Sequence, residues 1–282
     1  MKCRNRSFNW ALQCWIAVCF LVDVHAGFAG PQTVPSDPQA LVRQVVENEL
    51  QARLKESAYF CYCSGVQEGN ESRTETLVET RIGILKRLIS RNGRPLDPAQ
   101  LKHEDERIAN LIRKRGDLEK EASEQKEDLQ KNQSLLKLLP DAFIYKWESS
   151  DGNTARLSFQ PNPKFKPTTF EAKIFRAIVG SMLVDRSQNR LIELRGVLSR
   201  DLEFGWGILG QLNKGSSLEL RQNQIGHGLW VVTFYNLEVN GRAWFFKTIG
   251  KRSKESRWGF ELVPENLTLE DAANMLKAGC RT

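Results

Sequence analysis

The amino-acid sequence predicts an α+β fold with a large antiparallel β-sheet and few helices. From about residue 143 onward, apolar and polar residues alternate over short segments, as they do in strands with one buried face. Short turns containing glycine or asparagine separate these segments, and short connections favour antiparallel neighbours. Residues 97–133 differ because charged residues of both signs crowd them, which is typical of solvated helices.

The first 29 residues are expected to form a cleavable export signal. Basic residues open the chain, an apolar run covers residues 10–24 and small residues follow, which is the layout of a secretory signal peptide. The basic residues are Lys2, Arg4 and Arg6. Cleavage after Ala26 or after Ala29 fits the pattern equally well. The apolar run is shorter than the ~20 residues that a spanning helix needs, so we expect residues 30–282 to reach the periplasm as one domain.

The charge of the chain excludes one class of partner. The formal net charge is +7, and loss of three basic residues and one acidic residue with the signal leaves +5. The remaining basic residues are interspersed with acidic ones, whereas nucleic-acid binding needs a clustered basic surface. We therefore expect no nucleic-acid partner and, through weak attraction to anionic lipids, peripheral membrane contact at most.

Three cysteines, Cys61, Cys63 and Cys280, remain once the signal is removed. An oxidising compartment favours disulfides, but the number is odd. Cys61 and Cys63 share one face of a strand-like segment with Cα atoms about 6.5–7 Å apart, the strained limit for a bridge. A bond from either one to Cys280 would tie the C-terminal tail to the first strand, and buried free thiols are the alternative. No further residues with metal-ligand spacing accompany them, so no metal site is expected.

The N-terminal part of the mature chain predicts one helix followed by strands. Apolar residues recur on one face of residues 36–57, which indicates an amphipathic helix. A strand is expected at residues 59–66. A second, longer strand is expected at residues 76–90, with Gly83 as a bulge. Asn92-Gly93 then predicts a tight turn.

A charged helical insertion is expected at about residues 97–139. Asp97, Pro98 and Gln100 predict a helix start with a capping box. A narrow apolar stripe follows, which predicts one or two solvated helices. Residues 97–133 are either an arm that binds an envelope protein or only a solvated excursion, and both interpretations stay open.

The remaining chain predicts consecutive antiparallel strands. Residues 143–160 form a clear hairpin pattern in which Phe143, Tyr145 and Trp147 alternate along one face. Beyond it we expect a proline-rich loop at 161–167, a short helix at 170–178, strands at 179–185 and 190–198, and a glycine-rich corner at 205–210. In the last third we expect strands at 216–224, 229–239, 242–250 and 257–263, with turns at 226–228, at Asn240-Gly241 and around 251–256. A short helix at 267–277, with Thr268 as its cap, closes the chain.

No motif of a known catalytic class is present. The chain lacks a Gly-x-Ser-x-Gly elbow, a His-Glu-x-x-His pair and a phosphate-binding P-loop. Residues 205–210 match Gly-x-Gly-x-x-Gly, but no alternating βαβ pattern surrounds them. His103 lies in the charged helical segment and His227 in a glycine turn, where solvent-facing roles are expected. We therefore expect a non-enzymatic protein without a cofactor.

The order of these features resembles periplasmic proteins of the outer-membrane lipoprotein carrier superfamily, which share the LolA/LolB/RseB-type fold. The N-terminal helix, the hairpin at 143–160 and residues 170–264 carry the resemblance. Within them, residues 181–185 and 189–196 look like that superfamily's strand-turn-strand unit. The resemblance implies a half-open antiparallel barrel with helices over its concave side. The charged insertion departs from the compact carriers.

The resemblance also implies a ligand, namely the acyl chain of a lipid or a lipoprotein in a concave cavity. A curved sheet presents alternate residues inward, and each methylene buried there contributes ~0.8 kcal/mol. Two alternatives stay open: the aromatic side chains only fill the core, or the protein is an interaction or sensor module without a ligand. The candidates to line the cavity are Trp147, Phe159, Trp230, Phe234, Trp244 and Phe246.

Overall fold

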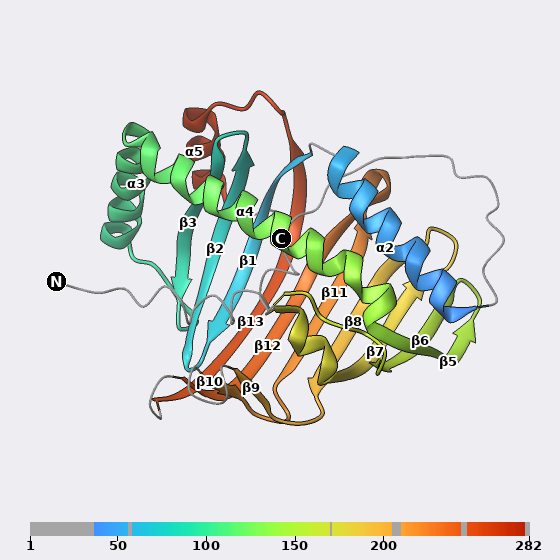
Figure 1. Cartoon of the computed structure of the whole chain (residues 1–282). Coiled ribbons are helices and arrows are strands. Elements are labelled where there is room, and N and C mark those ends of the chain that lie inside the picture. Colours follow the sequence, from blue (N-terminus) through green and yellow to red (C-terminus); the bar gives the residue numbers. More distant parts are fainter. Residues whose placement is uncertain (1–36, 56–57, 170, 205–209, 244–246, 280–282) are drawn as a thin grey trace.

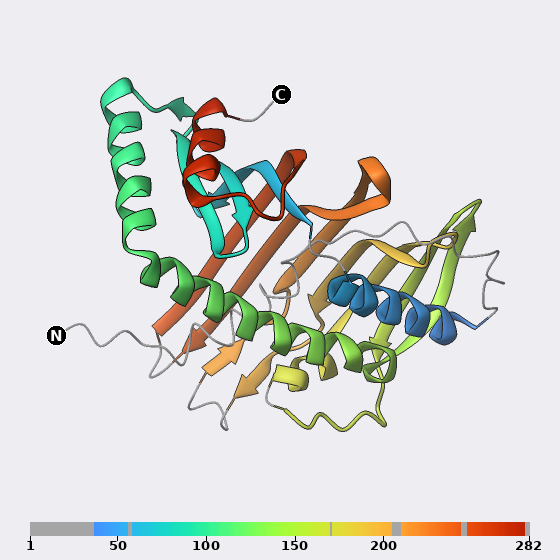
Figure 2. The same cartoon turned by 90° about the horizontal axis from the view of Figure 1, so that it is seen from above.

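The computed structural model describes residues 37–55, 58–169, 171–204, 210–243 and 247–279. These residues form an open antiparallel sheet with helices on both sides (Figures 1 and 2). The helices are α2 (Pro38–Lys55), α3 (Pro98–Arg113), α4 (Arg115–Ala142) and α5 (Leu269–Ala278), with the 3-10 turns η2 (Glu171–Arg176) and η3 (Gly226–Gly228). The strands are β1 (Tyr59–Glu68), β2 (Glu71–Thr80), β3 (Gly83–Arg91), β4 (Arg94–Pro95), β5 (Phe143–Asp151), β6 (Thr154–Pro161), β7 (Ile178–Asp185), β8 (Arg190–Leu198), β9 (Leu202–Phe204), β10 (Gly210–Leu212), β11 (Ser217–Ile225), β12 (Leu229–Ala243) and β13 (Lys247–Val263).

The strand order is β4-β3-β2-β1-β13-β12-β11-β8-β7-β6-β5, with the short pair β9 and β10 attached beside β12. The order begins and ends on unpaired edges, so the sheet is open. β13 lies between β1 and β12, and pairs such as Ser64 with Arg257 join the two ends of the chain. The predicted α+β fold, a large curved antiparallel sheet with an N-terminal helix and a charged helical insertion, is confirmed.

Helices α2 and α4 lie on the same side of the sheet, which we call the inner face (Figure 2). Leu41 and Val45 of α2 are buried in the largest apolar cluster, together with Leu157 of β6. Burial of each such side chain stabilises the fold by about 1.5–3 kcal/mol. Glu49 fixes α2 to β8, because its carboxylate accepts hydrogen bonds from Arg190 Nε (3.0 Å) and the Leu191 amide (3.2 Å).

On the opposite, outer face, α3 and α5 pack on the first strands, β1 to β3 (Figure 2). Val78 and Leu85 of the sheet and Leu276 of α5 are fully buried there. Charged residues of β6, β8 and β11 are joined by ion pairs, in keeping with an antiparallel sheet that has one face in solvent. The members of this ladder are Arg156, Glu193, Arg195, Glu219 and Arg221.

Several predicted local signals are present in the structure. Asp97 caps α3 by accepting from the Gln100 amide (2.8 Å), and the Gln100 side chain accepts from the Asp97 amide (3.0 Å). Thr268 caps α5 by accepting from the Asp271 amide (3.1 Å). None of the described helices is long and apolar enough to cross a membrane.

The prediction of a single strand over residues 76–90 is wrong. The chain turns between β2 and β3, and the Thr80 hydroxyl closes the turn by accepting from the amides of Ile82 and Gly83 (both 3.3 Å). Gly83 has a φ of 154°, and a Cβ there would lie 3.0 Å from Leu118 Cγ of α4. Gly83 is therefore the first residue of β3, and its lack of a side chain leaves room for Leu118 of α4. Apolar and β-branched residues surround the turn, so the composition of the segment predicted one continuous strand.

The turns predicted at Asn240-Gly241 and at residues 251–256 are also wrong. β12 runs through Asn240 and Gly241 without a break, and β13 runs from Lys247 to Val263. Gly241 pairs with Ile249 on one side and with Leu212 on the other. A Cβ at Gly241 would lie 2.3 Å from the Gln211 carbonyl oxygen. The glycine therefore permits the close approach of β10 and does not form a hairpin turn.

Candidate functional site

The six aromatic residues predicted to line a cavity do not share one environment. Trp147 keeps the predicted alternation with Phe143 and Tyr145, because it pairs with Leu157 before the β5 bulge, but it is 38 % exposed on this edge strand. Phe159 is buried in the inner-face core, with its ring 4.8 Å from that of Phe143.

The other described candidates are held by polar and cationic neighbours. Trp230 is buried and donates from Nε1 to Gln188 Oε1 (2.9 Å). Phe234 is half-buried between the guanidinium of Arg221 (4.7 Å from the ring centroid) and the ammonium of Lys254 (5.7 Å). Trp244 and Phe246 lie outside the described residues. The four described aromatic side chains therefore do not converge on one cavity.

The two cysteines of β1 differ in state. Cys63 is disulfide-bonded, whereas Cys61 is a free, buried thiol, so the two do not bond to each other. Burial, and then the nearby Glu261 carboxylate, raises the pKa of Cys61, which disfavours the reactive thiolate. Cys280 lies outside the described residues. Among the residues that the structure describes, no group of histidine, cysteine and carboxylate side chains could hold a metal ion.

A cluster of buried and half-buried polar and charged side chains lies on the inner face, on β1, β2 and β13. Tyr62 and Ser64 point to this face because they alternate with Cys61 and Cys63, which face away from it. Arg257 donates from Nε to Glu255 Oε1 (2.7 Å), and the Ser64 hydroxyl donates to the same oxygen (2.8 Å). The Arg257 guanidinium also lies 5.6 Å from the centroid of the Tyr62 ring, within the range of a cation–π contact.

Glu79 of β2 completes this inner-face cluster, which we define as Tyr62, Ser64, Glu79, Glu255 and Arg257. Its carboxylate accepts a hydrogen bond from the Phe60 amide (3.1 Å) and one from Tyr62. Two carboxylates therefore share the neighbourhood of one buried arginine, and Glu255 has a direct ion pair with it.

The pKa values of the two carboxylates, Glu79 and Glu255, are shifted in opposite directions. Burial raises the pKa of Glu79 to about 7, although the Phe60 amide, Arg257 and Tyr62 oppose this. Burial acts in the same sense on Glu255, but the charge of Arg257 and the hydrogen bonds from Arg257 and Ser64 outweigh it and lower its pKa. Burial also raises the pKa of Tyr62. At neutral pH the cluster therefore holds one firmly ionised carboxylate and one that is close to its titration point.

Helix α4 runs across the sheet on the side of this cluster, from β3 to β5 (Figure 1). Its N-terminal end is anchored by Leu118, which is buried among α3, α5 and the first strands. Its C-terminal end is anchored by Leu135, which is buried in the core beside α2. Between these anchors a narrow stripe is half-buried or buried, and the other side chains are exposed and polar or charged. The half-buried residues of the stripe are Ala122, Gln125, Asp128, Leu129, Lys131 and Gln133, and Asn132 is buried.

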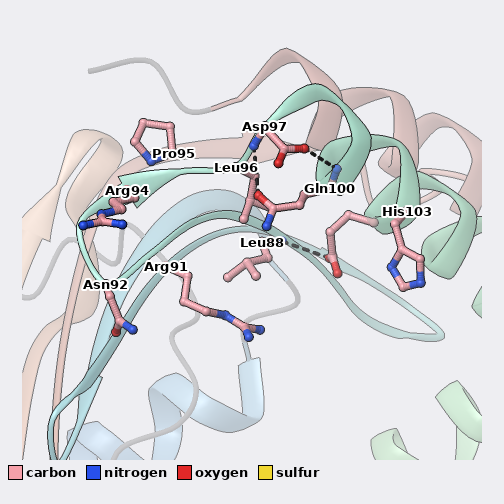
Figure 3. A pocket seen from close by; sticks show the side chains of 10 residues that line it. Leu88, Arg91, Asn92, Arg94, Pro95, Leu96, Asp97, Gln100 and His103 are labelled. Atoms are coloured by element: carbon pink, nitrogen blue, oxygen red, sulfur yellow. Dashed lines mark hydrogen bonds between the residues drawn. The ribbon is translucent and has the colours of Figure 1, made fainter.

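A separate pocket of about 680 Å³ lies at the edge of the sheet, between the β3–β4 turn and the start of α3 (Figure 3). Most of its lining is polar. The lining residues are Leu88, Arg91, Asn92, Arg94, Pro95, Leu96, Asp97, Gln100, His103 and Glu104. Its volume is in the range of small-molecule sites.

Neither the inner-face cluster nor this pocket was predicted from the sequence. The residues of the cluster are far apart in the chain, and only the pairing of β1 with β13 brings Ser64 next to Arg257. A usable signal was present in β13, where Glu255 and Arg257 occupy alternate positions on a face that neighbouring strands keep buried. The Asn92-Gly93 turn and the Asp97 cap were predicted, but not that they border a pocket.

Comparison with known proteins gives no relative. No family model matches the chain, and no curated protein and no solved structure is significantly similar to it. The resemblance to lipoprotein carriers therefore stays a prediction from the sequence.

Proposed function

We propose that the protein is an exported, non-enzymatic binding protein of the cell envelope. In this proposal it holds the acyl chain of a lipid or a lipoprotein on the inner face of the sheet, beneath α4. The support is the open sheet, the leader-like N-terminus and, above all, the way in which α4 crosses the sheet.

The anchoring of α4 carries the proposal. A helix that only completes a core packs an apolar stripe along its whole length. α4 instead buries Leu118 and Leu135 near its two ends, while the half-buried stripe between them mixes polar residues, such as Gln125 and Asp128, with the apolar Ala122 and Leu129. Displacement of such a polar contact by a ligand costs less than opening an apolar core, and each methylene buried in exchange contributes ~0.8 kcal/mol.

The inner-face cluster would set the orientation of the ligand. Arg257 is a buried cation of this face, so the polar end of an amphiphile is expected near it and the chain away from it. In this proposal the cluster only binds and orients the ligand and does not catalyse a reaction on it.

The test uses the mature chain purified from the periplasm. Organic extraction followed by mass spectrometry should recover a bound lipid, and a fluorescent fatty acid should bind to the delipidated protein. Gln125→Trp should reduce binding at least tenfold by filling the site beneath α4, whereas Lys126→Trp on the exposed side of the same turn should not. Absence of a lipid together with absence of fatty-acid binding contradicts the proposal.

A second candidate function is supported by the exposed face of α4, where acidic and basic residues alternate. This face could bind an envelope protein in a sensor role without any lipid. Deletion of residues 97–133 does not test this, because it would remove the buried Ile108 and Leu118 and unfold the first strands. Charge reversal at exposed positions such as Lys120 and Glu127 is the suitable change, with loss of a cross-linked partner as the expected result.

A further inference from the structure

We propose that the pocket between the β3–β4 turn and the start of α3 binds a phosphate group, held by Arg91 and Arg94. This site lies apart from the inner face, and the inference does not rest on the proposed function. Figure 3 shows Arg94 at one end of the pocket and His103 at the other, with Leu88 and Arg91 between them.

The first argument is a row of three arginines in register. Arg91 of β3 is directly opposite Arg73 of β2 and directly opposite Arg94 of β4. Like charges in directly opposed positions destabilise a sheet. Arg73 is compensated by Glu68 (3.0 Å) and Glu75 (3.3 Å). Arg91 and Arg94 form no ion pair in the part of the chain that the structure describes.

The second argument is that the acidic residues of the pocket are already engaged. The Asp97 carboxylate caps α3. Glu104 accepts from Arg107 (2.9 Å) and from the Leu88 amide (3.2 Å). Burial disfavours its charge, but these hydrogen bonds outweigh burial and lower the pKa of Glu104. Neither carboxylate is therefore available to neutralise Arg91 or Arg94, and the pocket has two uncompensated cations.

The third argument is pre-organisation. Asn92 (φ 50°) and Gly93 (φ 73°) form a tight turn, and the Asn92 side chain accepts from the Ser72 amide (2.9 Å). The turn fixes Arg91 and Arg94 as paired neighbours in the lining of the pocket. Two guanidinium groups offer planar pairs of donors that match phosphate oxygens. Leu88, Pro95 and Leu96 supply an apolar wall for the uncharged part of the ligand.

The phosphate could belong to a free phosphate compound or to a lipid headgroup, and the experiment has one arm for each source. Inorganic phosphate is titrated into the mature protein by calorimetry, with chloride at equal ionic strength as the reference. Vesicles of phosphatidylglycerol are compared with vesicles of phosphatidylcholine in a sedimentation assay. Each arm uses the wild type, Arg91→Gln/Arg94→Gln, and Arg176→Gln, which removes one charge that is also exposed but lies in the other half of the molecule.

We expect the double variant to bind at least about tenfold more weakly, because it removes both guanidinium groups that donate charge-assisted hydrogen bonds to the phosphate oxygens. Arg176→Gln should leave binding unchanged, and Arg91→Lys/Arg94→Lys should retain part of it. Binding of inorganic phosphate identifies a free compound, and Arg91- and Arg94-dependent binding of phosphatidylglycerol vesicles alone identifies a headgroup. The proposal is overturned if neither probe exceeds its reference, or if Arg176→Gln weakens binding as much as the double variant does.

Discussion

At the scale of single residues, Glu79 is the carboxyl group whose pKa the fold raises into the neutral range. Its carboxylate is placed beside Tyr62 and Arg257, but the ion pair of that arginine goes to Glu255. Burial therefore dominates, and the pKa of Glu79 rises from 4.5 to about 7. A group with a raised pKa in the folded state binds a proton that the unfolded chain has already released.

Glu79 should consequently make stability depend on pH. Its contribution is fully present below about pH 4.5 and is lost as the pH rises through about 7. Between these values the free energy of unfolding should fall by at most about 1.4 kcal/mol per pH unit from this group alone. Glu79→Gln should remove that slope, whereas Glu71→Gln, at the exposed start of the same strand, should keep it. Urea unfolding at several pH values measures this, and parallel curves for wild type and Glu79→Gln would refute it.

The cysteines allow a second prediction at this scale. Cys61 should resist alkylation in the native protein, because it is buried and its pKa is raised, and should react once the protein is denatured. Cys63 is disulfide-bonded, and we expect Cys280 as its partner because it is the other cysteine of the predicted mature chain. Peptide mapping without reductant should recover the 63–280 pair. Iodoacetamide label on Cys63 before reduction would contradict the assignment.

At the scale of the elements, the sequence predicted best where the chemistry is local. α2, the capping box of α3, the hairpin of β5 and β6 and the cap of α5 each depend on residues within a few positions of one another. The errors at Gly83 and Gly241 have the opposite origin, since both glycines accommodate segments that arrive from elsewhere. Leu118 packs over the first and Gln211 over the second, and no local pattern announces such neighbours.

Gly241 can be tested against a matched glycine on the adjacent strand. Gly241→Ala should destabilise the protein by about 1–3 kcal/mol, because its Cβ would overlap the Gln211 carbonyl oxygen of β10. Gly250→Ala should change stability little, because its Cβ would meet nothing closer than Asn240 Oδ1 at 3.9 Å. Thermal unfolding of the two variants measures the difference. Equal effects would show that the approach of β10 does not determine the residue at position 241.

At the scale of the whole molecule, the sheet combines two kinds of pairing. The hairpins from β5 to β8 join neighbours in sequence, whereas β1 pairs with β13 across most of the chain. The candidate site depends on the non-local pairing, since the inner-face cluster forms only when β13 lies between β1 and β12. This is also why the site was harder to predict from sequence than the fold.

The order of folding should follow this division. Closing the loop between β1 and β13 costs more entropy than closing a hairpin turn, so non-local pairing forms late. In pulse-labelled hydrogen exchange during refolding, amides of β6, β7 and β8 should become protected before those of β1 and the second half of β13. Hydrogen exchange of the native protein at equilibrium should show a different order of protection. Amides of β1 and β13, which are central strands, should exchange more slowly than those of β5, which is an edge strand that opens easily. Early protection of β1 and β13 would mean that the inner-face cluster helps to nucleate the fold. In that case Arg257→Met should slow refolding, whereas late pairing predicts that it mainly speeds unfolding.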